Sequence, residues 1–344
     1  MPNFAPECCH NPLLDAAPCS LAFARHAGDF TAWRATMDTT LRQLVGVMPE
    51  PVPLDVRVEW ETTSESFTER RFLFTAEAGA EVPCHLLLPT HGTAPFPVVI
   101  CLQGHSTGMH ISLGRAQFPG DEATIAGGRD FALQAVREGY AALAIEQRCF
   151  GERRDQRQGH VHNIGCTHAS MTALLLGRTM IGERVWDISR AIDALATFPE
   201  IDGTRIGCMG NSGGGTITYY AACLEPRITA AMPSCYVCTF KDSSGRIDHC
   251  PDNYLPGILR YAEMADWAGL IAPRPLVVVA GLQDDIFPIA GVREAFATIQ
   301  DIYRACGADD RCRLIVGPEG HRFYPEQGWP IFRELFDRSV YTVK

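Results

Sequence analysis

The chain has 344 residues, of which 46% are hydrophobic and 20% are charged, and its net charge is −10 at pH 7. This composition is typical of a folded globular protein and excludes a wholly disordered chain. Lysine and arginine do not cluster among aromatic residues, so we expect no nucleic-acid partner. No stretch reaches the roughly 18 uninterrupted apolar residues that a membrane span needs, so we expect no membrane partner.

The amino terminus and the cysteines indicate the cellular compartment. Residues 1–9 contain neither the basic nor the apolar segment of a signal peptide, which predicts a cytoplasmic protein. The 14 cysteines are then expected to be reduced thiols. Cys235 and Cys238 form the one C-x-x-C pair, and no second pair completes a zinc spacing, so we expect no metal.

Residues 1–50 are predicted to form a helical N-terminal extension, because apolar residues recur at helical spacing within residues 29–44. This extension is a candidate contact surface for a homo-oligomer. Residues 51–344 are predicted to form one larger domain. At its start, residues 54–60 and 70–75 alternate apolar and polar side chains, as antiparallel strands at a sheet edge do.

From residue 97 onward, near-continuous apolar runs alternate with helical segments. The runs cover residues 97–102, 140–145, 205–209, 228–232, 275–280 and 313–316. Strands buried on both faces and alternating with helices predict an α/β fold with a mostly parallel, doubly wound sheet. Two insertions, about 147–172 and 235–269, follow strand ends and are predicted to form lid-like walls of a ligand site.

The most specific motif is Gly210-Asn211-Ser212-Gly213-Gly214, which lies between an apolar run and a helical segment. Strand, sharp turn and helix are the context of a nucleophile elbow, in which the serine hydroxyl is presented at the turn. Glycines two residues before and after the serine fit this geometry, because neighbouring backbone comes too close for side chains. The motif predicts that Ser212 is a catalytic nucleophile.

A serine nucleophile needs a base, an acid that orients the base, and donors for the oxyanion. His321 follows the last predicted strand in a glycine-containing turn and is the candidate base. Asp284 and Asp285 both follow the preceding strand, and the residues alone leave the choice of acid open. The candidate oxyanion donors are the backbone N–H groups of Gly213 and of His105, which lies in the loop after the first buried strand.

These motifs together resemble the α/β-hydrolases that include acetyl xylan esterases, cephalosporin C deacetylases and dienelactone-hydrolase-like proteins. The similarity spans residues 82–336 and rests on the elbow and on residues 103–106, 147–153, 281–288 and 320–321. The resemblance implies an α/β-hydrolase fold with residues 51–344 as the catalytic domain. In this group the acid stands three residues after a glycine and four before a proline, which selects Asp284 with Pro288. Residues 249–275 further resemble a bacterial branch of the group.

The predicted function is therefore that of a serine carboxylesterase acting on small-molecule esters with a short acyl chain, such as acetyl. Triad chemistry needs no cofactor, so none is expected. One alternative is an amidase or peptidase of the prolyl-oligopeptidase type, although the segment before residue 97 is too short for the propeller of those enzymes. The other is a non-catalytic binding protein on a hydrolase fold, which would typically lack a triad member.

Four further residues are candidates for binding the substrate. They are Gln103, Arg148, His249 and Tyr254. For Arg148 the alternative is a structural ion pair, and for His249 it is a place in the lid structure. His160, His162 and His168 form a histidine-rich loop whose role as pocket wall, solvent-exposed surface or metal site the sequence leaves open.

Overall fold

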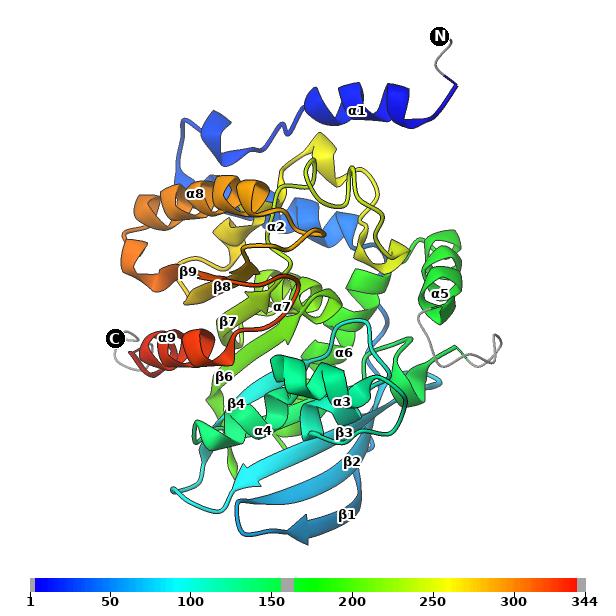
Figure 1. The fold of residues 1–344 in the computed structure, drawn as a ribbon, viewed down its shortest axis with the longest axis vertical. Helices are drawn as coiled ribbons and strands as arrows, with labels where there is room; N and C mark the ends of the chain where they lie inside the picture. The colour runs from blue at the N-terminus through cyan, green and yellow to red at the C-terminus, as the bar shows by residue number, and fades with distance from the viewer. Residues whose placement is uncertain (1–3, 156–163, 339–344) are drawn as a thin grey trace.

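A nine-stranded sheet runs through the described part of the chain, residues 4–155 and 164–338 of a computed structural model (Figure 1). Its strands are β1 (Arg57–Thr63), β2 (Phe67–Glu77), β3 (Ala80–Pro89), β4 (Phe96–Leu102), β5 (Ala141–Ile145), β6 (Ile201–Asn211), β7 (Ile228–Ser234), β8 (Leu276–Gly281) and β9 (Cys312–Gly317). Their order is β1-β2-β3-β5-β4-β6-β7-β8-β9. The pairs from β1 to β5 are antiparallel, and those from β5 to β9 are parallel. The predicted sheet is confirmed.

Helices cover both faces of the sheet. One face carries α2 (Phe30–Leu44), α6 (Met180–Leu195), α7 (Gly213–Leu224) and α8 (Ile289–Ala305), and the other carries α4 (Phe131–Arg137) and α9 (Pro325–Arg338). Along β4, Val98 and Ile100 belong to the first core, whereas Val99 and Cys101 belong to the second. This alternation follows from the two-residue period of a strand, and it makes the sheet doubly wound.

Side-chain caps fix where two of the helices begin. The carboxylate of Asp29 accepts hydrogen bonds from the N–H groups of Thr31 and Ala32, at 3.2 and 3.3 Å, so α2 begins at Phe30. Thr179 Oγ1 accepts from Gly182 N–H at 3.0 Å at the start of α6. Such caps satisfy N–H groups that have no partner inside the helix.

The N-terminal extension consists of two dissimilar helices. α1 (Glu7–Asp15) has no buried residue and lies at the outer end of the molecule (Figure 1). α2, in contrast, buries Trp33, Met37 and Leu41 in the core that also contains α7 and α8. A homo-oligomer contact through this extension stays a prediction. Among the described residues, no helix has both the length and the apolar character required to cross a membrane.

Both insertions lie beyond the carboxyl ends of strands, as predicted. The first includes α5 (Ile164–Leu175), and the second includes the short turns Pro251–Asn253, Ile258–Arg260 and Met264–Leu270. α5 contacts the Pro251–Asn253 turn, so the two insertions meet. Two residues of the histidine-rich loop, His160 and His162, lie outside the described residues. His168 is exposed on α5.

Candidate active site

Ser212 occupies a sharp turn between β6, which ends at Asn211, and α7, which begins at Gly213. Its backbone angles are φ 59° and ψ −126°, a conformation that side-chain-bearing residues rarely adopt and that is often found at functional sites. Two backbone hydrogen bonds hold the turn. Ser212 N–H donates to Ser234 O at 2.9 Å, and Thr216 N–H donates to Ser212 O at 2.9 Å. The predicted strand, turn and helix are all present.

Close backbone packing explains two of the glycines around this turn. A Cβ atom on Gly214 would collide with the carbonyl oxygen of Leu102 at the end of β4. A Cβ atom on Gly104 would lie 2.9 Å from the Cβ atom of Ser212 and 2.5 Å from the carbonyl oxygen of Asn211. The loop after β4 is therefore pressed directly against the elbow.

Asp284, and not Asp285, contacts the predicted base. Asp284 Oδ2 lies 2.8 Å from His321 Nδ1, and its Oδ1 accepts from the N–H groups of Ile286 and Phe287 at 3.0 and 3.1 Å. Burial opposes ionisation of Asp284, but the hydrogen bond and attraction to His321, with these two N–H groups, hold its pKa below the ordinary value. Asp285 is exposed and has no polar partner within the described residues.

Aromatic rings and one thiol enclose His321. The ring of Phe287 stacks on His321, with centroids 5.8 Å apart and an interplanar angle of 17°. The ring of His249 makes an edge contact with Phe287, with centroids 5.0 Å apart and an interplanar angle of 63°. The Cys235 thiol lies within 4.8 Å of the facing Asp284 and His321 atoms, and burial together with the charge of Asp284 raises its pKa to about 12. Cys235 is therefore a neutral neighbour of the pair.

The two predicted oxyanion donors lie next to each other. Gly213 is the first residue of α7, so its N–H has no acceptor inside the helix. In the part of the chain that the structure describes, the N–H of His105 has no acceptor either. A Cβ atom on Gly213 would lie 3.1 Å from His105 Nδ1, which places the two segments in contact.

A buried ion pair fixes the His105 ring. His105 Nε2 lies 3.1 Å from Asp252 Oδ2, and the same oxygen lies 2.9 Å from Nη1 of the buried Arg184. Burial alone would lower the pKa of His105, but the attraction and hydrogen bond to Asp252 outweigh it and raise the pKa to about 9. The ring is therefore cationic at neutral pH. Asp252 lies in the second insertion and was not among the predicted site residues.

Two groups of side chains contain donor atoms of the kinds that bind metals. Within the described residues, they are His105, Cys166, Cys250 and Asp252, and Cys235, Asp284 and His321. In each group the carboxylate is already ion-paired, with His105 and Arg184 in the first and with His321 in the second. A cation entering the first group would face the guanidinium of Arg184, so its charge favours the ion pair over a metal.

A cavity of about 450 Å³ joins these elements. Its lining includes His105 and Ser106 from the loop after β4, Arg129 from the segment before α4, and His321 and Arg322 from the loop after β9. One cavity thus brings together the predicted base and the residue that supplies a predicted oxyanion donor.

The side chain of Gln103 holds neighbouring loops by hydrogen bonds that could not be predicted from the sequence. Its side chain is buried, and its Nε2 donates to Ser112 Oγ at 2.6 Å and to the Arg129 carbonyl oxygen at 2.7 Å. The carbonyl oxygen of Gln103 in turn accepts from the side chain of Gln147. Gln103 is absent from the cavity lining, and its amide holds the loop of Arg129, so a contact of Gln103 with substrate stays a prediction.

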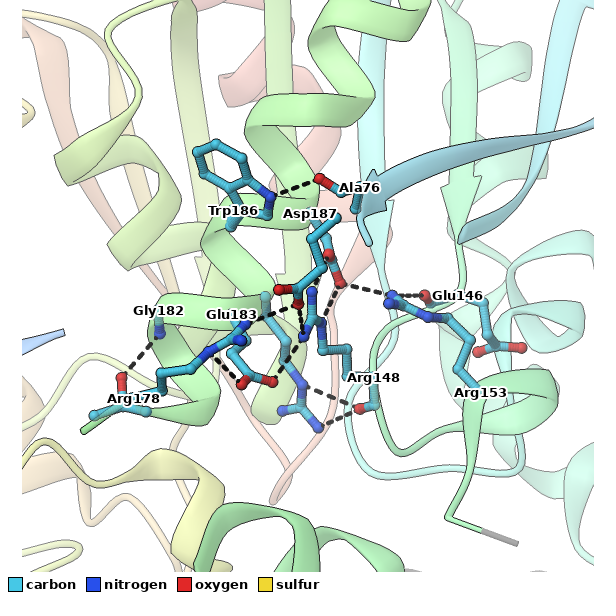
Figure 2. A network of polar contacts seen from close by, with 12 residues as sticks. Ala76, Glu146, Arg148, Arg153, Arg178, Gly182, Glu183, Trp186 and Asp187 are labelled. Carbon is cyan, nitrogen blue, oxygen red and sulfur yellow. Dashed lines mark hydrogen bonds and ion pairs between the residues drawn. The ribbon is translucent and has the colours of Figure 1, made fainter. Parts of the chain in front are cut away.

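Arg148 makes the ion pairs of the structural alternative, and a contact with substrate stays a prediction. Figure 2 shows its guanidinium between the carboxylates of Glu183 and Asp187. Its nitrogens lie 2.8 and 2.9 Å from the Asp187 oxygens, 2.8 Å from Glu183 Oε2 and 2.7 Å from Glu77 Oε1. Arg153 adds a second cation 2.6 Å from Asp187 Oδ2. Four of the five N–H donors of Arg148 are thus occupied by carboxylates.

His249 and Tyr254 are placed differently from each other. His249 lies beside Phe287, and its Nε2 is buried without a hydrogen-bond partner in the described structure. The hydroxyl of Tyr254 donates to Ser244 O at 2.9 Å, and its ring lines an apolar groove against α1. Tyr254 is absent from the cavity of His321. The structure therefore keeps His249 near the site and moves Tyr254 away from it.

Sequence reasoning missed four residues at this site: Cys235, Asp252, Phe287 and Arg129. A signal existed for Asp252, because it lies inside the motif from His249 to Tyr254 that resembles the bacterial branch. For Arg129 no local pattern separates it from the other arginines.

Comparison with known proteins agrees with this fold. A model of the Abhydrolase family, Abhydrolase_7, matches residues 10–301, and the chain therefore belongs to this family. The chain is 26% identical over 294 residues to "Putative hydrolase YtaP" of Bacillus subtilis (strain 168), covering 84% of this chain and 94% of that protein. The predicted membership of the α/β-hydrolase group is confirmed.

Solved structures show the same fold at low sequence identity. A crystal structure named as a "putative acetyl xylan esterase" from Bacteroides fragilis NCTC 9343 superposes with a TM-score of 0.77 at 17% identity, covering 97% of this chain and 96% of that one. A glucuronoyl esterase from Solibacter usitatus superposes with a TM-score of 0.71 at 16% identity, with coverages of 94% and 97%. The predicted α/β-hydrolase fold is thereby confirmed.

Proposed function

We propose that the protein is a serine carboxylesterase with Ser212 as nucleophile, His321 as general base and Asp284 as the acid that orients it. The observation that carries the proposal is the 2.8 Å hydrogen bond between His321 Nδ1 and Asp284 Oδ2, in a chain that presents Ser212 on a strained elbow. Family membership and the esterases among the structural neighbours support the same class of reaction.

The reaction begins when Ser212 Oγ attacks the ester carbonyl carbon while His321 Nε2 takes the hydroxyl proton. Asp284 holds the other ring nitrogen, so it fixes the tautomer that leaves Nε2 free to act as base. The tetrahedral intermediate then expels the alcohol, which receives the proton from the imidazolium. Water enters, gives a proton to His321 and attacks the acyl-enzyme, and release of the acid restores Ser212.

The backbone N–H groups of Gly213 and His105 are proposed to bind the oxyanion. Each donor of this kind typically contributes about 10²–10³ in turnover, because it is oriented before the negative charge develops. The His105 ring adds a positive charge in the same place, since Asp252 keeps it protonated and Gly213 packs against it. This charge favours the negatively charged intermediate over the neutral ester.

The proposed acyl group is acetyl or of similar size. The Phe287 ring lies flat against His321 and His249 packs behind it, so bulky side chains occupy the space beside the proposed base. The structural neighbour named as an acetyl xylan esterase supports the same acyl size.

Initial rates on p-nitrophenyl acetate, butyrate and octanoate test the proposal, with wild type compared with Ser212→Ala. We expect turnover to fall with chain length, and the variant to lose a factor of about 10⁴ or more on the acetate. Equal inertness of both proteins on all three esters would contradict the proposal and direct attention to amide substrates. A flat dependence on chain length, with Ser212 still required, would contradict only the proposed acyl size.

A further inference from the structure

Arg129 is a charged residue in the lining of the cavity of His321, and the mechanism above does not use it. It is the last residue of the short segment Ile125–Arg129, whose helical backbone is interrupted by a kink at Gly128, with φ 81° and ψ 28°. Its carbonyl oxygen accepts the hydrogen bond from Gln103, and the carbonyl oxygen of Gly128 accepts from Gln134 Nε2 at 3.0 Å. The carbonyl groups of Gly128 and Arg129 are thus both held by glutamine side chains, which fixes the backbone at Arg129.

The guanidinium of Arg129 has no protein partner in the described structure. Across residues 4–155 and 164–338 it makes no hydrogen bond, ion pair or ring contact. The remaining residues, 1–3, 156–163 and 339–344, include no aspartate or glutamate. Arg129 is half-buried, and loss of water around its guanidinium lowers its pKa, while within the described residues no carboxylate compensates for this loss.

Two other arginines, Arg184 and Arg274, have several partners for their guanidinium groups. Arg184 contacts Asp252, and its Nη2 donates to the Arg148 carbonyl oxygen at 2.7 Å. Arg274 donates to four backbone carbonyl oxygens from its terminal nitrogens. Within the described residues Arg129 differs from these two arginines in having no partner for its guanidinium, and it faces the cavity that holds the proposed base.

The other charges around the cavity leave it positive. Its one lining carboxylate, Asp121, already accepts from Thr107 Oγ1 at 2.5 Å, and its other oxygen lies 2.8 Å from His110 Nε2 and accepts two backbone N–H groups. Arg322 is paired with Glu319 at 2.8 Å. The cationic His105 and Arg129 therefore both face a space with no free carboxylate among its described lining residues.

We propose that Arg129 binds a carboxylate on the substrate, so that the enzyme prefers esters that carry a free carboxylate near the scissile bond. This inference rests on the proposed esterase function and adds the substrate class to it. A guanidinium presents parallel N–H donors that match the two oxygens of a carboxylate, and a charge-assisted pair of this kind is stronger than a neutral hydrogen bond. The carboxylate stands either on the acyl side of the ester, as in a half ester of a dicarboxylic acid, or on the alcohol side, as in an acylated hydroxy acid.

Two matched pairs of esters separate these sources. Ethyl hydrogen succinate and ethyl pentanoate differ in a carboxylate on the acyl side, and O-acetylglycolate and propyl acetate differ in one on the alcohol side. Release of ethanol or acetate gives kcat/KM for each ester. We expect the charged member of one pair to exceed its neutral partner about tenfold or more, and Arg129→Gln to reduce this preference about ten- to a hundredfold, mainly through KM.

Arg129→Lys keeps the charge but loses the parallel donors, so it should retain part of the preference. Arg304→Gln is the matched control, because Arg304 is exposed on α8 and pairs only with Asp301. It should keep the wild-type preference. Inhibition of p-nitrophenyl acetate hydrolysis by succinate or glycolate is a test that needs no variant. We expect one of these carboxylates to compete with the ester in the wild-type enzyme.

The outcomes distinguish the two proposals. If neutral esters are hydrolysed in a Ser212-dependent way but neither charged ester is preferred, the role of Arg129 is wrong and the esterase function stands. An undiminished preference in Arg129→Gln would lead to the same conclusion. If neither the four esters nor p-nitrophenyl acetate is hydrolysed, the esterase function itself is wrong. Should Arg129→Gln not fold, Arg129→Lys and inhibition by the two carboxylates decide the question.

Discussion

Arg148 and Arg129 are both arginines in the loops that surround the carboxyl ends of the strands, yet their surroundings are opposite. Arg148 contacts the carboxylates of Glu77, Glu183 and Asp187, and this network joins β2 to α6 (Figure 2). Arg129 has no partner in the described structure and faces the cavity of His321. An arginine that is paired with carboxylates stabilises the fold. An arginine whose guanidinium has no protein partner is available to bind a ligand. The predictions below test this division, from the largest expected effect to the smallest.

The proposed acid should matter for chemistry far more than its neighbour in sequence. Asp284→Asn is expected to lower kcat on p-nitrophenyl acetate about 10⁴-fold, because an amide no longer holds the catalytic tautomer of His321. Asp285→Asn is the matched control and should stay within about twofold, since Asp285 is exposed and unpartnered in the described structure. Equal losses in both variants would contradict the assignment of Asp284.

The Arg148 network should matter for stability. Asp187→Ala removes the carboxylate shared by Arg148 and Arg153, and leaving these cations unpaired should lower the free energy of unfolding by about 3–5 kcal/mol. Arg129→Gln removes a charge that has no partner and should change it by about 0.5 kcal/mol or less. Urea unfolding measures both variants. If Arg129→Gln were as destabilising as Asp187→Ala, the division between the two arginines would be wrong.

The ion pair of His105 with Asp252 should make stability depend on pH. The pKa of His105 is about 9 in the folded protein and 6.5 for the unperturbed group. Its contribution is therefore fully present below about pH 6.5 and is lost as the pH rises through about 9. The loss is on the order of 3 kcal/mol.

Urea midpoints at pH 6 and pH 9.5 measure this loss. We expect a larger decrease for the wild type than for His105→Gln, because the variant has no imidazole to titrate while Asp252 keeps its contact with Arg184. Identical decreases in the two proteins would show that His105 is not held in its charged form.

Tyr254 should contribute little to either activity or stability. Tyr254→Phe removes one hydrogen bond, from the phenol hydroxyl to Ser244 O, on a partly exposed ring away from the cavity of His321. Stability is expected to fall by about 1 kcal/mol or less, and kcat/KM on p-nitrophenyl acetate to stay within about twofold. A large rise in KM would return Tyr254 to the substrate site, where the sequence had suggested it.

Most of the fold could be predicted from the sequence, because its signals are local. Buried parallel strands are near-continuous apolar runs, β2 alternates in burial, and the helices repeat their apolar residues at helical spacing. The elbow was predictable for the same reason. Gly210, Ser212 and Gly214 stand at fixed offsets between β6 and α7, so the motif can be read from neighbouring residues. The edge strand β1 differs from the prediction of a half-buried strand, because all seven of its residues are exposed.

The parts that the sequence did not reveal depend on contacts between distant segments. Asp252 is the partner of His105 only because the second insertion folds back over the loop after β4. The Gln103 side chain donates to the backbone carbonyl oxygen of Arg129. A contact to backbone cannot be predicted from the pattern of side chains in the sequence. Arg148 and Arg129 carry the same charge, and only the three-dimensional placement of Glu77, Glu183 and Asp187 distinguishes them.

Covalent labelling of the nucleophile tests the central claim most directly. Diethyl p-nitrophenyl phosphate phosphorylates an activated serine and releases one p-nitrophenolate, so the mass of the intact protein and the mass of its peptides locate the reactive residue. We predict one diethylphosphoryl group per chain on Ser212, with a matching loss of activity on p-nitrophenyl acetate and no label in Ser212→Ala. A label on another residue with the same loss of activity, or full activity in Ser212→Ala, would contradict the account.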